Sequence, residues 1–485
     1  MGDLLVRGKL VSVESVSAAL ARQATHGGRL GENLVAMGSI AQDAFDDFLH
    51  RLPAEPANLA ATGVDPAELM GLMMKLIYTG RLETVREFSD AIKLPYQIVL
   101  ELVEMAIARK LLQAIGSRGG GMGNINYTLT EEGHRWTLDA IKRVGYTGPA
   151  PVPLEQFTDQ INLQKLTNEV ITFERIRKSI GSLTIEDSLI EQCGPALNSG
   201  RALLLYGPPG NGKTSVAHCL AGVFNDIIYV PYALLVEGQI IRVFDPSIHL
   251  SLDPAGLSDD PALSLVRREV FDARWVPCRR PFVVAGGELT LDMLDLRYET
   301  NGHFYEAPLH MKALCGCFII DDFGRQLITP AALLNRWIVP LEARVDYLKL
   351  HTGKSFTIPF EELIIFSTNL EPEELMDAAF LRRLPYKIEV GVPSLATYRR
   401  IFDNECANQG LTLPSQTFDA IVRKIKDEKG LDLAAYQPKF IVDQIVASCR
   451  FMEQPPRLEP RFIEYALDNL RIHHTSPPPA APQRP

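Results

Sequence analysis

The segment that most constrains this chain is an eight-residue loop between a short apolar run and a helical pattern. Residues 202–206 form the apolar run, and Gly207-Pro-Pro-Gly-Asn-Gly-Lys-Thr214 follows at once. Residues 216–221 then continue with the spacing of a helix. The loop matches the pattern G-x-x-x-x-G-K-[ST] in the strand–loop–helix context that the pattern requires. The sequence therefore predicts an α/β domain with a phosphate-binding loop.

The residue types in this loop suit a nucleoside triphosphate and its metal ion. Glycines let consecutive backbone N–H groups turn inward around the phosphates, and the following helix presents its positive end to them. Lys213 is expected to reach the β- and γ-phosphates, and Thr214 is expected to give its hydroxyl to Mg²⁺. The predicted cofactors are ATP and Mg²⁺. The predicted nucleotide-binding residues of the loop are Gly207, Pro208, Pro209, Gly210, Asn211, Gly212, Lys213, Thr214 and Ser215.

A second apolar run, residues 316–320, ends in the acidic pair Asp321 and Asp322. An apolar strand that ends in an acid is the Walker B arrangement, in which the first acid holds the Mg²⁺ shell. We therefore expect Asp321 and Thr214 to be the metal residues, and Asp322 to be the catalytic group that orients and polarises the attacking water. Many ATPases place Glu at the second position. Because Asp is one methylene shorter, slow turnover or a different water position remains open.

Further polar residues follow the next two predicted strands. Residues 363–368 form a third strand that delivers Asn369, whose side chain can reach the γ-phosphate and the water, the role called sensor 1. Arg382 and Arg383 precede a strand at residues 386–390. They are placed like arginine fingers, which complete a neighbour's site and stabilise charge in the transition state. The alternative is a surface arginine pair. Lys439 occupies the sensor 2 region, where Arg is common.

In this order, the segments resemble an AAA+ ATPase over about residues 160–470. The predicted hairpin formed by residues 345–350 and 355–358 is similar to the pre-sensor-1 insertion of the MoxR-like and related clade. Residues 321–326 and 334–340 resemble bacterial proteins described only as predicted ATPases with chaperone-like activity. The resemblance implies Mg²⁺-dependent ATP hydrolysis and a homo-oligomer, most simply a hexameric ring with ATP sites between subunits.

The resemblance also implies an insertion between the second strand and the acidic strand, at residues 232–314. Residues 280–290 and 302–308 within this stretch look like an inserted hairpin that faces the central pore or a partner.

The first fifty residues contain a weak internal repeat, in which residues 2–10 resemble residues 30–40. Each copy reads as helix, glycine turn and helix, with Gly8 and Gly38 as C-caps. Residues 29–40 resemble the N-terminal domain of type II secretion and type IV pilus assembly ATPases, where some tandem pairs bind cyclic di-GMP. The first copy lacks the Arg-Leu of the second and is out of register by one residue. A protein-docking module is therefore favoured over a nucleotide sensor.

Three helical patterns at residues 67–78, 82–92 and 96–111 precede a predicted hairpin. The hairpin consists of residues 112–115 and 125–129 around a glycine-rich turn at 119–123, and a last helix follows. This order is typical of a winged helix, a fold that often binds DNA through its third helix. The domain has about as many acids as bases, so it lacks the excess of positive charge that DNA affinity requires. Protein interaction is favoured over DNA binding.

Composition narrows the remaining alternatives. The 485 residues carry a net charge of −10, which argues against a globally basic nucleic-acid binder but leaves a local basic face possible. No apolar run reaches the roughly 20 residues that span a bilayer. Seven cysteines, an odd number, fit reduced thiols in a cytoplasmic protein better than a disulfide framework.

The predicted organisation is a P-loop AAA+ α/β core with a C-terminal helical lid, preceded by a small helical module and a winged-helix domain. The predicted segments are the module at 1–52, the winged helix at 64–146, a proline-rich linker at 147–160, the core at 161–392, the lid at 393–474 and a disordered tail at 475–485.

Three functions fit this organisation. The first is a ring-forming ATPase that remodels a protein client, which the two N-terminal modules deliver. The second is an ATP-dependent switch for a secretion, pilus or cyclic di-GMP-linked assembly. The third is a DNA-associated ATPase that uses the winged helix, which the acidic balance of the chain disfavours.

Overall fold

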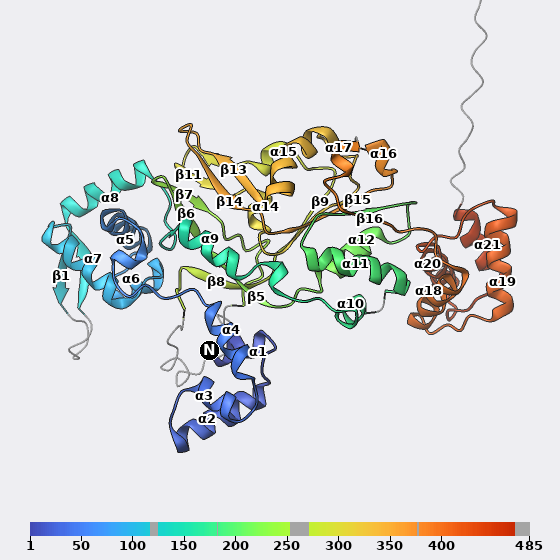
Figure 1. Cartoon of the computed structure of the whole chain (residues 1–485), viewed down its shortest axis with the longest axis horizontal. Coiled ribbons are helices and arrows are strands. Elements are labelled where there is room, and N and C mark those ends of the chain that lie inside the picture. Colours follow the sequence, from blue (N-terminus) through green and yellow to red (C-terminus); the bar gives the residue numbers. More distant parts are fainter. Residues whose placement is uncertain (117–124, 182, 253–270, 376–377, 471–485) are drawn as a thin grey trace, which may run out of the picture. The chain divides into compact units, whose positions relative to one another are not determined.

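The computed structural model describes residues 1–116, 125–181, 183–252, 271–375 and 378–470 (Figure 1). The predicted glycine-rich turn at 119–123 and the predicted tail at 475–485 lie outside these residues. Contacts within the chain define two compact units. Unit 1 consists of Met1–Val170, Leu197–Ala202 and Ala221–Ile365, and unit 2 consists of Ile171–Ala196, Leu203–Leu220 and Phe366–Pro485.

Unit 1 begins with four short helices built as two copies of one motif. Gly31 lies 29 positions after Gly2, and Phe45 lies 29 positions after Val16. Each glycine packs against its partner side chain so closely that a Cβ at Gly31 would overlap the Phe45 ring and one at Gly2 would lie 2.9 Å from Val16 Cγ1. The helices are α1 (Gly2–Arg7), α2 (Val13–His26), α3 (Leu30–Ala36) and α4 (Gln42–His50).

The two copies are in register, which corrects the expectation of a one-residue offset. The residue equivalent to Gly38 is Lys9, and both adopt left-handed φ values, 67° and 56°. Gly8, the expected counterpart, has a helical φ of −72°. The first copy therefore ends with the same backbone turn as the second although it has no glycine at that position. The one-residue offset arose because the sequence comparison matched Gly8, rather than Lys9, with Gly38.

The next segment of unit 1 has three helices, an antiparallel strand pair and a fourth helix, in the order expected of a winged helix. Leu112 and Leu129 face each other in the strand pair. Apolar side chains of all three leading helices, including Met73, Phe88 and Leu102, form its core. The elements are α5 (Pro66–Gly80), α6 (Val85–Ile92), α7 (Tyr96–Ala108), β1 (Leu112–Gly116), β2 (Asn126–Leu129) and α8 (Glu131–Arg143).

The remainder of unit 1 contains a five-stranded sheet, β10-β11-β7-β6-β3, and three separate strand pairings. Its helices are α9 (Leu154–Leu163), α14 (Leu309–Lys312) and α15 (Pro330–Ala343), with 3₁₀ turns η1 (Ala60–Thr62), η2 (Leu166–Asn168) and η3 (Leu291–Leu294). The sheet strands are β3 (Val152–Pro153), β6 (Ala233–Val236), β7 (Gln239–Arg242), β10 (Arg297–Glu299) and β11 (Phe304–Glu306).

The three other pairings are one parallel pair and two antiparallel pairs. The parallel pair is β9 (Phe282–Ala285) with β12 (Cys317–Ile320). The antiparallel pairs are β5 (Ile227–Pro231) with β8 (Trp275–Arg279), and β13 (Val345–Lys349) with β14 (Ser355–Pro359). The last pair confirms the predicted hairpin before the third strand.

Residues 280–290 do not form the expected inserted hairpin. Strand β9 pairs in parallel with β12, and Val283 and Ala285 turn buried side chains into the core. An earlier apolar strand, β5, pairs antiparallel with β8 instead. Several short apolar runs of similar length could pair with β12, and tertiary packing determines which of them does. In the other part, residues 302–308, β11 does form an antiparallel hairpin with β10. This hairpin packs within unit 1, where the ring centroids of Phe304 and Tyr146 are 6.0 Å apart.

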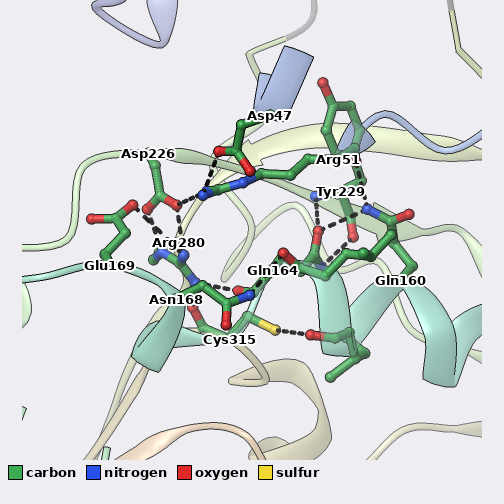
Figure 2. A network of polar contacts seen from close by, with 12 residues as sticks. Asp47, Arg51, Gln160, Gln164, Asn168, Glu169, Asp226, Tyr229, Arg280 and Cys315 are labelled. Carbon is green, nitrogen blue, oxygen red and sulfur yellow. Dashed lines mark hydrogen bonds and ion pairs between the residues drawn. The ribbon is translucent and has the colours of Figure 1, made fainter. Parts of the chain in front are cut away.

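A buried arginine ties the first module to the rest of unit 1 (Figure 2). Arg280 donates two hydrogen bonds to Asp226 and others to the carbonyl oxygens of Gln164, at 2.8 Å, and Cys315, at 2.6 Å. Asp226 also forms an ion pair with Arg51, just after α4, at 3.6 Å. Burial opposes ionisation of Asp226, but the charge of Arg280 outweighs it and lowers the pKa of the carboxyl group. Arg280 is thus an internal anchor rather than part of an exposed hairpin.

Unit 2 contains one parallel strand pair and a C-terminal group of helices. Strands β4 (Leu203–Tyr206) and β16 (Tyr386–Glu389) pair in parallel. The C-terminal helices enclose their own apolar core, which includes Tyr398, Phe402 and Phe462. The helices of the unit are α10 (Phe173–Ile180), α11 (Asp187–Ser199), α12 (Lys213–Ala221), α16 (Pro372–Leu375), α17 (Ala378–Leu381), α18 (Leu395–Asn408), α19 (Ser415–Arg423), the π-helical η4 (Lys424–Glu428), α20 (Gln437–Phe451) and α21 (Pro460–Asn469).

Strand β15 (Leu363–Ser367) belongs to both strand sets, because the unit boundary falls within it. At its start, the Leu363 N–H donates to the Gly316 carbonyl oxygen beside β12. Just past its end, the Thr368 N–H donates to the Leu205 carbonyl oxygen of β4. The strand order is therefore β16-β4-β15-β12-β9. Among the described residues, no helix combines the length and the apolar character needed to cross a bilayer.

Candidate functional site

The glycine-rich loop between β4 and α12 has the backbone that its sequence requires. Gly207, Gly210 and Gly212 have φ values of 128°, 81° and 85°, a region that side chains other than glycine rarely enter. Space is also limited, because a Cβ at Gly207 would lie 2.8 Å from the Val390 carbonyl oxygen and one at Gly210 would overlap the Tyr436 ring. Two of the three glycines are therefore needed for both backbone conformation and close packing.

Lys213 is the first residue of α12, and its side chain folds back over the loop. Its Nζ donates to the carbonyl oxygens of Gly207, at 2.9 Å, and Pro208, at 2.8 Å, and the residue is only 6% exposed. The first helical hydrogen bond joins the Val216 N–H to the Gly212 carbonyl oxygen, so α12 begins directly at the loop. A buried ammonium group and a helix N-terminus thus meet at one loop, which favours an anion there.

The C-terminal helices contact the same loop within unit 2, a feature that the sequence did not predict. The Tyr436 N–H donates to the Gly210 carbonyl oxygen at 2.9 Å, and the Ala435 N–H donates to Asn211 Oδ1 at 3.1 Å. The Asn211 side chain is buried, and its Nδ2 has no hydrogen-bond partner in the described part of the chain. An unpaired buried donor beside a phosphate-type loop suits an oxygen-rich ligand.

The predicted lysine of the sensor 2 region, Lys439, is exposed in the first turn of α20. The buried polar residue of that turn is Gln437 instead. Its Oε1 accepts hydrogen bonds from the Tyr398 hydroxyl, at 3.1 Å, and from the Ala434 N–H, at 3.0 Å. Gln437 therefore fixes the approach to α20 that brings Ala435 and Tyr436 to the loop. A lone buried glutamine carries little sequence signal, so its role was missed.

Asp321 and Asp322 stand at the end of β12, as predicted. The Asp321 N–H donates to the Ala285 carbonyl oxygen of β9 at 2.9 Å. Asp322 is exposed and has a left-handed φ of 48°, a conformation that Asp tolerates better than most residues. Gln326 holds this turn, since its Nε2 donates to the Asp321 carbonyl oxygen at 2.9 Å and its Oε1 accepts from the Gly324 N–H at 2.8 Å. No local sequence pattern pointed to this role of Gln326.

Asn369 follows β15 and is partly exposed, as expected for a polar residue at a strand end. The preceding Thr368 is 1% exposed. Its hydroxyl oxygen accepts a hydrogen bond from the Leu370 N–H at 3.2 Å. This turn fixes where the Asn369 backbone leaves the strand. At the neighbouring end of β4, burial, and secondarily the charge of Glu389, raise the pKa of the Tyr206 hydroxyl.

Arg382 and Arg383 follow the short helix α17, where Arg382 is exposed and Arg383 is half-buried. The Arg383 N–H donates to the Phe380 carbonyl oxygen at 2.8 Å. The end of this helix is further held by Lys387, whose Nζ donates to the Leu381 carbonyl oxygen at 3.0 Å. The two arginines therefore lie on a fixed turn between α17 and β16.

The predicted residues are divided between the two units. The loop, Asn369 and the two arginines belong to unit 2, whereas Asp321 and Asp322 belong to unit 1. In the described ranges, no group of three or more His, Cys, Asp or Glu side chains is arranged to hold a metal ion. The seven cysteines, all within the described residues, form no disulfide, and all except Cys219 are buried.

A family model described as "Domain of unknown function (DUF8689)" matches residues 394–469, the C-terminal helices. No curated protein matches the chain.

Many solved structures match the chain, and the two described here resemble it distantly. NtrX from Brucella abortus is 13% identical, with 67% of this chain and 59% of that chain covered and a TM-score of 0.33. A RuvB mutant from Thermotoga maritima is 15% identical, with 63% and 73% covered and a TM-score of 0.30. The chain therefore spans less than two thirds of the NtrX chain. At such low similarity, neither structure indicates what this chain binds or does.

Proposed function

We propose that this chain is an AAA+-type ATPase that binds and hydrolyses ATP in the presence of Mg²⁺. The observation that carries the proposal is the loop between β4 and α12, in which three glycines with positive φ lead into a helix whose first residue is the buried Lys213. The strand order β16-β4-β15-β12-β9, with the loop after β4 and the acidic pair after β12, supports the same proposal.

The residues of the loop fit the triphosphate of ATP. Lys213 Nζ donates to the carbonyl oxygens of Gly207 and Pro208, and phosphate oxygens are stronger acceptors because they are charged. The backbone N–H groups at the start of α12 and the unpaired Asn211 Nδ2 supply further donors. In this proposal, Lys213 exchanges its carbonyl partners for phosphate oxygens when ATP binds.

Thr214 and Asp321 are the residues that would hold Mg²⁺, which neutralises charge on the phosphates when it is bound. Asp322 would accept the proton of the attacking water, and Asn369 would orient that water. The exposed position of Asp322 leaves its carboxylate accessible to water. Arg382 and Arg383 would act on the site of a neighbouring subunit, which requires a homo-oligomer, in our proposal a hexameric ring.

We propose that the work done with ATP is the remodelling of a protein partner that the N-terminal modules bind. The balanced charge of residues 64–146 supports a protein partner over DNA there. The second candidate is an ATP-dependent switch for a secretion, pilus or cyclic di-GMP-linked assembly. The structure shows that α1–α2 and α3–α4 repeat in register, which supports this candidate more strongly than the offset inferred from the sequence. The match is not complete, because Met1 stands where the second copy has Leu30.

Equilibrium binding of ATP to the full chain tests the proposed site. Lys213→Ala should lose binding because it removes the one buried ammonium of the loop. Lys426→Ala, which removes an exposed lysine of η4 in the same unit, is the matched control and should bind as the wild type does. Equal ATP affinity of the Lys213→Ala protein and the wild type would contradict the site assignment.

A further inference from the structure

A cavity of about 310 Å³ lies in unit 1, whereas the phosphate-type loop belongs to unit 2. Helix α5 forms one wall, the end of α8 forms another, and the turn between β6 and β7 closes the third. Most of its lining is apolar and includes Leu72, Trp136, Leu235 and Ile240. This volume is at the small end of the range for ligand pockets, so a small molecule suits it better than a folded partner.

One buried cation interrupts the apolar lining. Lys75 is 5% exposed, and its Nζ donates to the Val144 carbonyl oxygen at 2.8 Å. An ammonium group has three N–H donors, and the described part of the chain offers this one no carboxylate partner. Burial, helped by the charge of Arg143, lowers the pKa of Lys75 to about 8. The group therefore still carries a largely uncompensated charge at neutral pH.

The other charged residues at the cavity leave it positive. Arg143 adds a second cation to the lining, and Glu68 is the one acid that the described residues place there. Glu68 is exposed to solvent, and burial of part of its side chain, followed by the charge of Asp65, raises the pKa of its carboxyl group. Cationic groups beside apolar walls are complementary to a ligand that has one negative charge and an apolar body.

We propose that this cavity binds a small carboxylate with an apolar body, whose carboxylate lies on Lys75 and whose apolar part packs against Trp136, Leu235 and Ile240. The remaining N–H donors of Lys75 would then gain a charged acceptor. This acceptor would offset the free-energy cost of burying the ammonium group without a charged partner. Such a ligand would contact α5, α8 and the β6–β7 turn together. It would therefore join the three-helix segment to the five-stranded sheet of unit 1.

Decanoate is a suitable probe, because decanol and decylammonium share its chain but not its charge. Trp136 is half-buried in the cavity wall, whereas Trp275 and Trp337 are fully enclosed elsewhere. Tryptophan fluorescence of the full chain therefore reports binding at the cavity, and titration calorimetry checks the stoichiometry. We expect saturable binding of decanoate and binding about tenfold or more weaker for decanol and decylammonium. Absence of saturable decanoate binding, or equal binding of decanol, would overturn the proposal.

The matched variants locate the site. Lys75→Met keeps the length of the side chain and removes its charge, and it should weaken decanoate binding about tenfold or more. Lys142→Met, at an exposed position of α8 outside the cavity lining, should leave binding unchanged. Arg143→Met supplies a second test in case Lys75→Met does not fold, and it should also weaken decanoate binding. A folded Lys75→Met or Arg143→Met protein with wild-type affinity would show that the cations of this cavity do not bind the carboxylate.

Discussion

Two neighbouring acids show how strongly the surroundings of a single residue decide its chemistry. Glu361 forms ion pairs with Lys165, at 3.1 Å, and Arg344, at 2.8 Å. Glu362 is fully buried, and neither carboxyl oxygen has a hydrogen-bond partner in the described ranges. Burial raises the pKa of Glu362 well above its usual value. Glu361 is thus paired with two cations, whereas burial favours the neutral form of Glu362.

This difference predicts opposite effects of the same substitution. Above about pH 4.5, the unfolded chain releases the Glu362 proton while the folded chain keeps it, so stability falls as pH rises toward the raised pKa. Glu362→Gln removes this loss, and its unfolding temperature should exceed that of the wild type by more at pH 8 than at pH 5. Glu361→Gln should instead lower the unfolding temperature, because Lys165 and Arg344 lose their partner. Thermal unfolding by circular dichroism measures both variants.

A Glu362→Gln protein whose unfolding temperature follows the wild-type pH dependence would show that Glu362 is ionised in the folded state. The same thermal unfolding measurements on Glu361→Gln are the control, because they show the effect of removing a neighbouring acid that forms ion pairs.

At the scale of elements, the N-terminal repeat depends on one close helix contact. A Cβ at Gly31 would overlap the Phe45 ring, so Gly31→Ala should separate α3 from α4 and cost about 1–3 kcal/mol. Phe45→Leu removes the ring that would clash, and the double variant Gly31→Ala/Phe45→Leu should lose less than the sum of the two single variants. Amide hydrogen exchange in residues 30–50 of the full chain provides the readout. Additive losses would show that the two residues do not share a contact.

Elements with strong local patterns were predictable from the sequence. The loop after β4, the strands β12 and β15, and the hairpin β13–β14 all follow from apolar runs with turn residues at their ends. Local pattern cannot decide which of several short apolar runs pairs with another, and for that reason β9 was mistaken for part of an insertion.

Residue roles that depend on distant segments were also missed. Asn211 lies within the predicted loop, but its contact with Ala435 joins positions more than two hundred residues apart in the chain. Lys75 is visible as a charge within an apolar helix, but its cavity forms only when α5, α8 and the β6–β7 turn come together. Lys9 adopts a left-handed turn without the glycine that signals one. In each case the tertiary structure carries information that no local pattern contains.

At the scale of the whole molecule, the proposed ATPase requires residues from two subunits at each site. Arg382→Ala/Arg383→Ala should keep ATP binding and reduce hydrolysis by about 10³–10⁵-fold, the worth of arginine fingers supplied by a neighbour. Mixing this protein with Lys213→Ala should restore part of the activity, because some interfaces then combine an intact loop with intact arginines. The readout is ATP hydrolysis per subunit, measured against protein concentration. Activity per subunit that stays constant on dilution to a monomer would rule out the shared site.

The central claim is that the loop at 207–214 binds ATP for Mg²⁺-dependent hydrolysis. The most direct measurement is steady-state phosphate release by the full chain, with and without Mg²⁺, for the wild type, Lys213→Ala and the Lys426→Ala control. The wild type and Lys426→Ala should release phosphate from ATP only when Mg²⁺ is present, and Lys213→Ala should release none above background. Wild-type rates from Lys213→Ala, or no Mg²⁺-dependent release from the wild type at any protein concentration, would contradict the claim.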